Sequence, residues 1–514
     1  MKNIPTEVLQ KSGETHKMFF KILPYLLILF VIFFLYFKTT SYDISGTDDD
    51  VFSQITFKNT SVADTFSIFL RSSFDYYRPL LTLSFMTDNS ISNNSPQALH
   101  TTNIILHSIA CMLFFFFLKN YFFNTLLSLL AALFFAVHPV NIFAVAWIPG
   151  RNDLLLFIFM ISSVIFLVQY AKTQKNIFFI LHYLAFAASL LTKEVAILMP
   201  VIYIFYMLNR KTCFKKYTVP VILWTAGSFI LFLIHFVASS KMFTMANYMA
   251  NLSASYKTFF DYYCGAYFLQ IHFSSYFGNA LLWLGILAFF MSFIFAFFSK
   301  LTAIEKIFYF AFPPALILIC LLSGQFFYQG NRMYIPTACL IITFCSFADR
   351  LKNKKIIYVF LICLISISFF ITHKQSSYFE NPIAFLHKTD SERPNYNTYM
   401  ANLYSYNLMK YNRLAEASVK VKEIAKNTNY KSNYNLYMLA VIYMHEKNYA
   451  QAAEIFSRII AVDPFDIYIK LYICYDFTGE IEKRIYCRRQ LDSMAGDPGK
   501  VQVLISNQLE LFKR

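Results

Sequence analysis

The feature that most constrains this chain is a series of apolar segments, each long enough to cross a bilayer. A membrane-spanning helix needs about 20 mostly apolar residues, and about eleven such segments occur in the first 375 positions. Hydrophobic residues make up 57% of the 514, more than a single soluble core can bury. The pattern excludes a soluble globular enzyme and predicts an all-α, polytopic membrane protein. The segments centre near Phe30, Leu113, Leu130, Phe159, Ala185, Tyr203, Leu231, Ala288, Leu316, Ile342 and Leu361.

The basic residues between these segments predict the orientation. Alternate connections, beginning with the N-terminal segment, hold 17 basic and 4 acidic residues, whereas the others hold 10 of each. Because cytoplasmic loops are enriched in Lys and Arg, the N-terminus is predicted to be cytoplasmic. An odd number of spans then puts the C-terminus on the extracytoplasmic face of a bacterial inner membrane or its equivalent. This distribution accounts for the net charge of +16, so no nucleic-acid partner is expected.

Charge density divides the chain into two predicted domains. Residues 1–375 hold 41 charged side chains, and the much shorter stretch 376–514 holds 33. We therefore predict a transmembrane domain over residues 1–375 and an extracytoplasmic soluble domain over residues 376–514. Within the first domain, residues 38–99 form a first extracytoplasmic loop too long for a simple connection.

The C-terminal domain carries a pattern typical of tetratricopeptide (TPR) repeats. Pro464 and Pro498 are separated by the 34-residue period of that repeat. Small and aromatic residues recur at the matching positions, namely Leu436, Leu439, Ala440, Tyr443, Ala452 and Phe456. Stacked helix pairs of this kind often bind a peptide on a concave face, and a plain structural cap is the alternative.

Three consecutive carboxylates follow the first span. Asp48, Asp49 and Asp50 repel one another unless a cation lies nearby. One interpretation is a solvated turn beside Gly46. The other is a catalytic base, or a ligand for a divalent cation, held at the membrane face.

Further polar residues lie at the extracytoplasmic ends of the predicted spans. Ionisable groups at membrane depth are costly, so each is a candidate for function. Arg151, Lys193 and Arg332 share one side of the bilayer and together suit a phosphate group, with snorkelling to lipid headgroups as the alternative. His100 and His107 are two helical turns apart, which favours hydrogen bonding over metal binding. The other candidates for the pocket are Arg78, His100, Asn103, His138, Asp153, Glu194 and Tyr334.

Taken in order, these motifs resemble the GT-C superfamily of polyprenyl-phosphate-sugar glycosyltransferases, and within it the transmembrane and TPR-containing O-mannosyltransferases and their bacterial relatives. The resemblance covers nearly the whole chain. It rests on Asp48–Asp50, Tyr77-Arg78-Pro79-Leu80, His100 with Asn103 and His107, His138-Pro139-Val140, Ala144-Val145-Ala146, Gly150-Arg151 with Asp153, Lys193-Glu194, and Arg332 with Tyr334 and Pro336. The chain departs from the family pattern at Phe143 and Asn331, where glutamates are usual. Both departures bear on activity, and on a bound metal in particular.

The resemblance implies an inverting hexosyl transfer from a lipid-linked donor. One of Asp48, Asp49 or Asp50 would accept the proton of an acceptor hydroxyl. Arg151, Lys193 and Arg332 would stabilise the departing polyprenyl phosphate, and the repeats would hold an acceptor protein or peptide. No cofactor is certain, and a divalent cation stays an option.

Two other functional classes stay open from the sequence. A non-catalytic scaffold for envelope proteins would need one span rather than about eleven. A transporter of lipid-linked sugars would show internal inverted repeats and charges near the bilayer midplane. Here the charged residues gather at one face, which favours the transferase.

Overall fold

The computed structural model describes residues 6–44, 77–93, 95–200, 203–204, 218–238, 330–392, 398–430, 432–461, 463–495 and 497–513. Regular secondary structure in these ranges is helical throughout, without a strand, as predicted. The chain divides into two compact units, Met1–Asn381 and Pro382–Arg514. The predicted change of character at residue 375 lies in the last turn of α18 (Lys354–Ser376).

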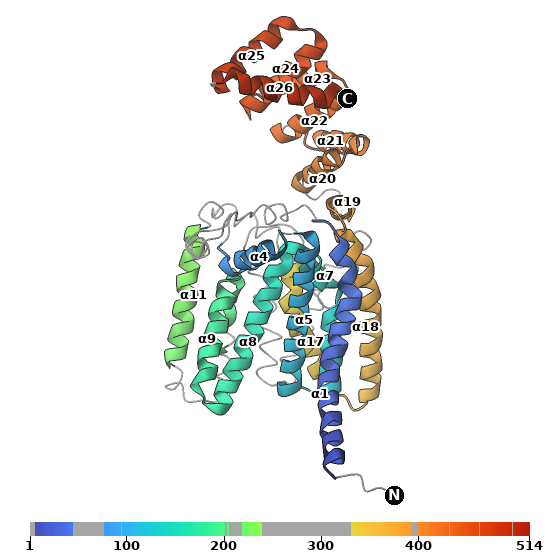
Figure 1. Cartoon of the computed structure of the whole chain (residues 1–514), viewed down its shortest axis with the longest axis vertical. Helices are drawn as coiled ribbons and strands as arrows, with labels where there is room; N and C mark the ends of the chain where they lie inside the picture. Colours follow the sequence, from blue (N-terminus) through green and yellow to red (C-terminus); the bar gives the residue numbers. More distant parts are fainter. Residues whose placement is uncertain are drawn as a thin grey trace. The chain divides into compact units, whose positions relative to one another are not determined.

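The first unit is a bundle in which α1, α5, α8, α9 and α18 run side by side and α4 lies across one end (Figure 1). Short 3-10 turns connect several of the long helices. The elements are α1 (Thr6–Tyr36), η1 (Phe37–Ser41), α4 (Pro79–Ser92), α5 (Pro96–Tyr121), α6 (Thr125–Val137), η2 (Pro139–Asn141), α7 (Ile142–Val145), η3 (Ile148–Gly150), α8 (Arg151–Thr173), α9 (Asn176–Leu190), η4 (Glu194–Leu198), α11 (Thr218–Ala238), η6 (Gly330–Met333), α17 (Tyr334–Ala348), α18 and η7 (Ser377–Phe379).

Four described helical segments are long and apolar enough to cross a membrane, which makes the first unit a multi-pass membrane domain. They are Lys21–Ser41, Pro96–Tyr121, Ile148–Thr173 and Lys354–Phe379, and a bent pair, Thr125–Val137 with Pro139–Val145, forms a fifth if counted as one span. Asn176–Leu190, Pro220–Leu231 and Tyr334–Ser346 are shorter apolar helices. The predicted segments around Ala288 and Leu316 lie outside the described residues, so the number eleven stays a prediction.

The interior of the bundle is built on α5 and α8. In each of their spans 56% of the apolar window is buried, against 22% in α18. Phe30 and Phe34 on α1, and Phe370 on α18, are all more than 60% exposed. Such exposed aromatic side chains suit contact with lipid, so α1 and α18 form the outer wall and α5 and α8 position the polar residues inside.

The span that begins with α6 is broken at a proline. Pro139 has no backbone N–H and ends the helix, which would leave the last carbonyls of α6 without partners in an apolar environment. Side chains from four elements lie within 2.6–3.3 Å of these carbonyl oxygens: Asn141 at Phe135, Tyr36 and His107 at Ala136, and Thr372 at Val137. The break is therefore stabilised by α1, α5, η2 and α18 together.

Helix α4 lies within the segment that the sequence predicts as the first loop. It begins with Pro79 at its first position and ends at Asn93, whose φ of 51° is left-handed. Its buried residues Leu81 and Phe85 pack against Leu99 and Ile148. Residues 45–76 of the predicted loop, including Asp48–Asp50, lie outside the described residues.

The second unit is a succession of short helices in which each packs against the next. Ala440, Ala452 and Phe456, three of the residues that carry the repeat pattern, are fully buried in its core. Pro464 stands at the first position of a helix. The TPR assignment itself stays a prediction. The helices are α19 (Pro382–Glu392), α20 (Thr398–Lys410), α21 (Leu414–Asn427), α22 (Asn433–His445), α23 (Tyr449–Arg458), α24 (Pro464–Thr478), α25 (Ile481–Ala495) and α26 (Pro498–Lys513).

Candidate functional site

The described candidates lie around the N-terminal ends of α5 and α8, with α4 and the short turns η2, η4 and η6. The three predicted catalytic residues, Asp48, Asp49 and Asp50, lie outside the described residues, so their role stays a prediction. The others are Arg78 just before α4, His100 and Asn103 in α5, His138 between α6 and η2, Arg151 and Asp153 in the first turn of α8, Lys193 and Glu194 at η4, Arg332 in η6 and Tyr334 at the start of α17.

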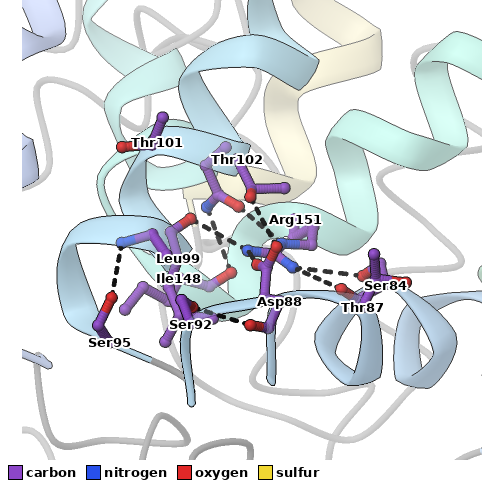
Figure 2. Close-up of polar contacts among 12 residues, drawn as sticks. Ser84, Thr87, Asp88, Ser92, Ser95, Leu99, Thr101, Thr102, Ile148 and Arg151 are labelled. Carbon is purple, nitrogen blue, oxygen red and sulfur yellow. Dashed lines mark hydrogen bonds and ion pairs between the residues drawn. The ribbon is translucent and has the colours of Figure 1, made fainter. Parts of the chain in front are cut away.

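Arg151 is fully buried and is held by groups from α4 and α5 (Figure 2). Its Nη2 lies 2.6 Å from Oδ2 of Asp88 in α4. Its Nε donates to Oδ1 of Asn103 at 2.8 Å, and its Nη2 donates to the backbone carbonyl of Leu99 at 3.0 Å. The ring of Phe85 covers the guanidinium, with 4.2 Å between Cζ and the ring centre. This network ties α4 and α5 to the start of α8.

Asp88 is the partner that the sequence analysis missed. Its Oδ1 accepts a hydrogen bond from Thr102 Oγ1 at 2.8 Å, while its Oδ2 is paired with Arg151 by charge rather than by a well-aligned hydrogen bond. The Nη1 of Arg151 also donates to the backbone carbonyl of Ser84 at 3.3 Å, one helical turn before Asp88. Recognising residues 79–92 as a helix would have put Ser84 and Asp88 on one face and revealed the acid as a candidate.

Gly150 permits the close approach that sets the position of Arg151. A Cβ at this position would lie 2.4 Å from the carbonyl oxygen of Phe143 and 2.7 Å from Cα of Ala144. Both are backbone atoms, which cannot move aside as a flexible side chain does. The glycine thus allows η3 to pack directly on α7, and the first turn of α8 follows immediately.

A second buried ion pair joins α8 to η4. Lys193 Nζ lies 2.6 Å from Oδ1 of Asp153, and it donates to Oδ1 of Asn152 at 3.3 Å. The side chains of Lys193 and Asp153 are each 5% exposed. The first turn of α8 therefore supplies the cation of one pair and the carboxylate of another.

A third pair, between Arg78 and Glu194, is more accessible. Arg78 Nε and Nη2 donate to the carboxylate of Glu194 at 2.9–3.2 Å, in a two-pronged arrangement. The two side chains are 15% and 27% exposed. The backbone N–H of Leu80 also donates to the carbonyl of Leu191 at 3.2 Å, so the start of α4 is fixed beside η4.

Three further candidates hold the irregular segment between α6 and α8. His107 Nδ1 lies 2.7 Å from the hydroxyl of Tyr334, and its Nε2 faces the broken end of α6. His138 Nδ1 accepts from the backbone N–H of Val140 at 3.3 Å. Asn103 Nδ2 lies within 3.4 Å of three backbone carbonyls, those of Val145, Trp147 and Ile148. The prediction of hydrogen bonding for His100 and His107 is confirmed at His107, whereas neither ring nitrogen of His100 has a hydrogen-bond partner within the described residues.

The two departures from the family pattern lie in different surroundings. Phe143 packs edge-on against Phe379, with 5.4 Å between ring centres and 86° between the ring planes. That position is therefore apolar in this chain. The side chain of Asn331 lies outside the described residues, while the neighbouring Arg332 belongs to η6, which packs on η2 and α7.

The described residues do not include a cluster of potential metal ligands. Within them, no three His, Cys, Asp or Glu side chains converge closely enough to hold an ion. The three consecutive aspartates fall outside these ranges, so a divalent cation stays a prediction.

The chain shares sequence with known mannosyltransferases in the region that contains most of these residues. Residues 82–238 match the family described as dolichyl-phosphate-mannose-protein mannosyltransferase, which covers less than a third of the chain. The match includes Asp88, Arg151, Asp153 and Lys193. It begins after Arg78 and ends well before Arg332.

Three relatives extend this likeness. A Protein O-mannosyl-transferase of Caenorhabditis elegans is 28% identical over 201 residues, 38% of this chain and 28% of the relative. Protein O-mannosyl-transferase TMTC2 of Mus musculus is 35% identical over 98 residues, 19% of this chain and 12% of the relative. Protein O-mannosyl-transferase TMTC3 of Homo sapiens is 30% identical over 157 residues, 30% of this chain and 17% of the relative.

The matched segments span 28% or less of the length of these relatives. No solved structure matches the chain. The family match lies within the membrane unit and includes the ion pairs of Arg151 and Lys193. The comparisons thus confirm the resemblance seen in the sequence: this chain is similar to the protein O-mannosyltransferases of the GT-C superfamily.

Proposed function

We propose that this chain is a membrane glycosyltransferase that moves a hexose from a polyprenyl-phosphate donor to an acceptor hydroxyl, with a protein as the favoured acceptor. The observation that carries the proposal is the group of three ion pairs formed by Arg151, Lys193 and Arg78 inside a membrane domain. Ionisable groups at membrane depth are rare and usually serve function. The names of the relatives favour mannose as the sugar.

The proposed reaction is a single displacement at the anomeric carbon. The acceptor oxygen forms a bond to that carbon while the bond from the carbon to the phosphate oxygen breaks, which inverts the configuration. One of Asp48, Asp49 or Asp50 takes the acceptor proton, and polyprenyl phosphate leaves with the electron pair of the broken bond. General-base catalysis of this kind contributes about 10²–10⁴-fold to the rate.

The three predicted phosphate-binding cations differ in what they offer such a leaving group. Arg151 is occupied by Asp88, Asn103 and two carbonyls, which supports a role in positioning α4 and α5. Lys193 pairs with one buried carboxylate, that of Asp153. Its ammonium has three N–H donors, so it can bind a phosphate oxygen while it keeps its contact with Asp153. We therefore assign the stabilisation of the phosphate to Lys193 and Arg332.

The proposal includes the orientation and the acceptor. The N-terminus is cytoplasmic and the second unit extracytoplasmic, because the basic residues of the sequence are biased to alternate connections. The second unit binds the acceptor protein, as the repeat pattern predicts. A divalent cation, if one acts, is held by Asp48–Asp50, since the described residues offer no set of three ligands.

The test is a transfer assay with the full chain in lipid nanodiscs. Radiolabelled polyprenyl-phosphate mannose is offered with a mixture of unfolded proteins, and transfer is compared for Asp48→Asn, Asp49→Asn, Asp50→Asn and the triple variant. We expect at least one single variant and the triple variant to lose about 10²-fold or more of the rate. Asp349→Asn is the matched control, because Asp349 pairs with Lys354 in an exposed ion pair just beyond the end of α17, opposite the end that carries Tyr334.

Two results would overturn the proposal. One is an unchanged rate in the triple variant. The other is movement of the labelled lipid across the bilayer of vesicles without transfer to any acceptor, which would indicate a transporter.

A further inference from the structure

His100 is a buried side chain whose hydrogen-bonding capacity is unused within the described part of the chain. The residue is 1% exposed, and neither Nδ1 nor Nε2 has a hydrogen-bond partner there. The backbone of Asp43 lies near the ring, but without the geometry of a hydrogen bond. Buried polar groups without partners destabilise a fold, so most buried histidines bond through at least one nitrogen.

The same face of α5 shows how unusual this is. Asn103 and His107 follow His100 by one and two turns, and both are also fully buried. Asn103 bonds to Arg151 and to three backbone carbonyls, while His107 bonds to Tyr334 and to the end of α6. Within the described residues, packing thus provides hydrogen-bond partners for Asn103 and His107 but not for His100.

The surroundings of His100 connect it to the first loop. The ring of Tyr42 meets it edge-on, with 6.3 Å between ring centres, and Arg151 lies close enough to interact with it electrostatically. The backbone N–H of Asp43 donates to the carbonyl of Glu380 at 3.0 Å, which anchors this strip of chain. In the sequence, the Asp48–Asp50 run begins five residues after Asp43.

We propose that His100 binds the sugar of the lipid-linked donor, by hydrogen bonds to one of its hydroxyl groups. This inference rests on the proposed function and adds to it a residue that selects the sugar. The argument rests on the two ring nitrogens, which have no hydrogen-bond partner within the described residues although the side chain is buried.

The chemistry of imidazole identifies a hydroxyl as the ligand. A neutral imidazole has one N–H donor and one bare nitrogen that accepts, and a hydroxyl group can serve both functions. A phosphate oxygen without a proton only accepts, so it would leave the bare nitrogen unsatisfied. A metal would need further ligands, and the described residues provide no cluster of three.

The experiment compares His100→Leu, which removes both nitrogens, with His100→Gln, whose amide keeps a donor and an acceptor. Transfer is measured with polyprenyl-phosphate mannose and with a series of its deoxy-sugar analogues, each lacking one hydroxyl. We expect His100→Leu to lower kcat/KM for mannose about 10- to 100-fold, the range for losing hydrogen bonds inside a protein. The Gln variant should retain more activity than the Leu variant.

The decisive result is the behaviour of one analogue. If a particular hydroxyl binds His100, its removal should cost the wild type activity and should abolish the difference between wild type and His100→Leu. The inference would be overturned if His100→Leu lost the same factor in kcat/KM with every analogue, or if that variant kept full activity and had a higher Tm. His100 would then contribute only to packing.

Donor binding separates failure of this inference from failure of the proposed function. The Tm of each variant is measured with and without polyprenyl-phosphate mannose. Suppose that the wild type transfers no sugar but that the donor raises its Tm more than it raises the Tm of His100→Leu. The proposed reaction is then refuted, while donor binding by His100 is supported. If the donor raises both by the same amount, or neither, the role of His100 is refuted.

Discussion

Arg151 and Asp88 form an ion pair that is almost inaccessible to solvent. Nη2 and Oδ2 lie 2.6 Å apart, and the side chains are 0% and 8% exposed. Removing one member of such a pair leaves the other as an uncompensated charge in a medium that solvates it poorly. The pair therefore holds α4 onto α8 only as long as both charges are present.

The Asp88→Asn variant tests this. The amide keeps the size of the side chain but removes the charge opposite Arg151, and we expect the free energy of unfolding to fall by about 3–5 kcal/mol. The measurement is thermal or denaturant unfolding of the full chain in nanodiscs. Asp349→Asn breaks an exposed pair with Lys354 and should change the stability far less. Equal effects of the two variants would show that burial of the Arg151 pair has no energetic weight.

Gly150→Ala should distort the same region through the backbone. The new Cβ would meet the Phe143 carbonyl and Ala144 Cα at less than 3 Å, so η3 must move away from α7. We expect a destabilisation of about 1–3 kcal/mol, as for other overpacked sites. Gly227→Ala is the matched control, because a Cβ in that helix would find only side-chain atoms at 3.8 Å or more.

For Gly227→Ala the expected change is neutral or stabilising, by up to about 1 kcal/mol, since alanine favours helix. Unfolding midpoints of both variants, measured under the same conditions, check this pair of predictions. An alanine at position 150 that is tolerated as well as one at 227 would contradict the tight packing of η3 on α7.

The spacing of apolar residues predicts much of this fold. It predicts helices such as α5, α8 and α18, because a span is a local property of about 20 residues. It also predicts hydrogen bonding rather than metal binding for His100 and His107, because two turns of helix separate them, and His107 does bond to Tyr334 and to the carbonyl of Ala136.

Pairing between distant helices is what the sequence does not disclose. Asp88 was missed because its helix lies in a segment that looks like a loop, and its partner Arg151 is specified only by how α4 crosses the bundle. The carboxylates opposite Lys193 and Arg78 were both named as candidates, but not as their partners. Ion pairs depend on tertiary contacts between helices that are distant in the sequence. The spacing of residues along one sequence does not predict which charged residues meet.

The thiols of the second unit should be unreactive in the folded protein. Cys474 and Cys487 are buried and free, although their sequence alone leaves a disulfide open. Burial raises the pKa of Cys474 to about 12 and that of Cys487 to about 11, from a usual value of 9.0. At pH 8 both are protonated, and the thiolate is the reactive form.

We therefore expect labelling by a thiol reagent at pH 8 to be slow in the native chain and fast after unfolding, with mass spectrometry locating the labelled residues. The pKa of each folded thiol lies above its unfolded value, so the unfolded state loses protons first and stability falls as pH rises through about 9. Rapid native labelling at these two positions, or a Cys474–Cys487 disulfide in the isolated protein, would contradict the prediction.

Variants of the ion pair between Lys193 and Asp153 test whether Lys193 acts in the transfer reaction or only stabilises the fold. Lys193→Gln removes the ammonium that lies 2.6 Å from the buried Asp153 carboxylate, which should lower both stability and the rate of sugar transfer. The double variant Lys193→Gln with Asp153→Asn replaces the ion pair by two neutral amides, and it should recover most of the stability. If Lys193 stabilises the departing phosphate, the double variant should still transfer sugar about 10²–10³-fold more slowly than the wild type, as expected for the loss of one donor to a developing charge.

The measurement is kcat for mannose transfer beside the unfolding midpoint, for the wild type and the three variants. Asp153→Asn alone keeps the ammonium and frees it from its carboxylate, so its kcat should exceed that of the double variant even where its stability is lower. Recovery of both stability and rate in the double variant would mean that Lys193 only holds η4 against α8. The charge that meets the leaving phosphate would then have to come from elsewhere in the membrane unit, with Arg332 as the first residue to replace.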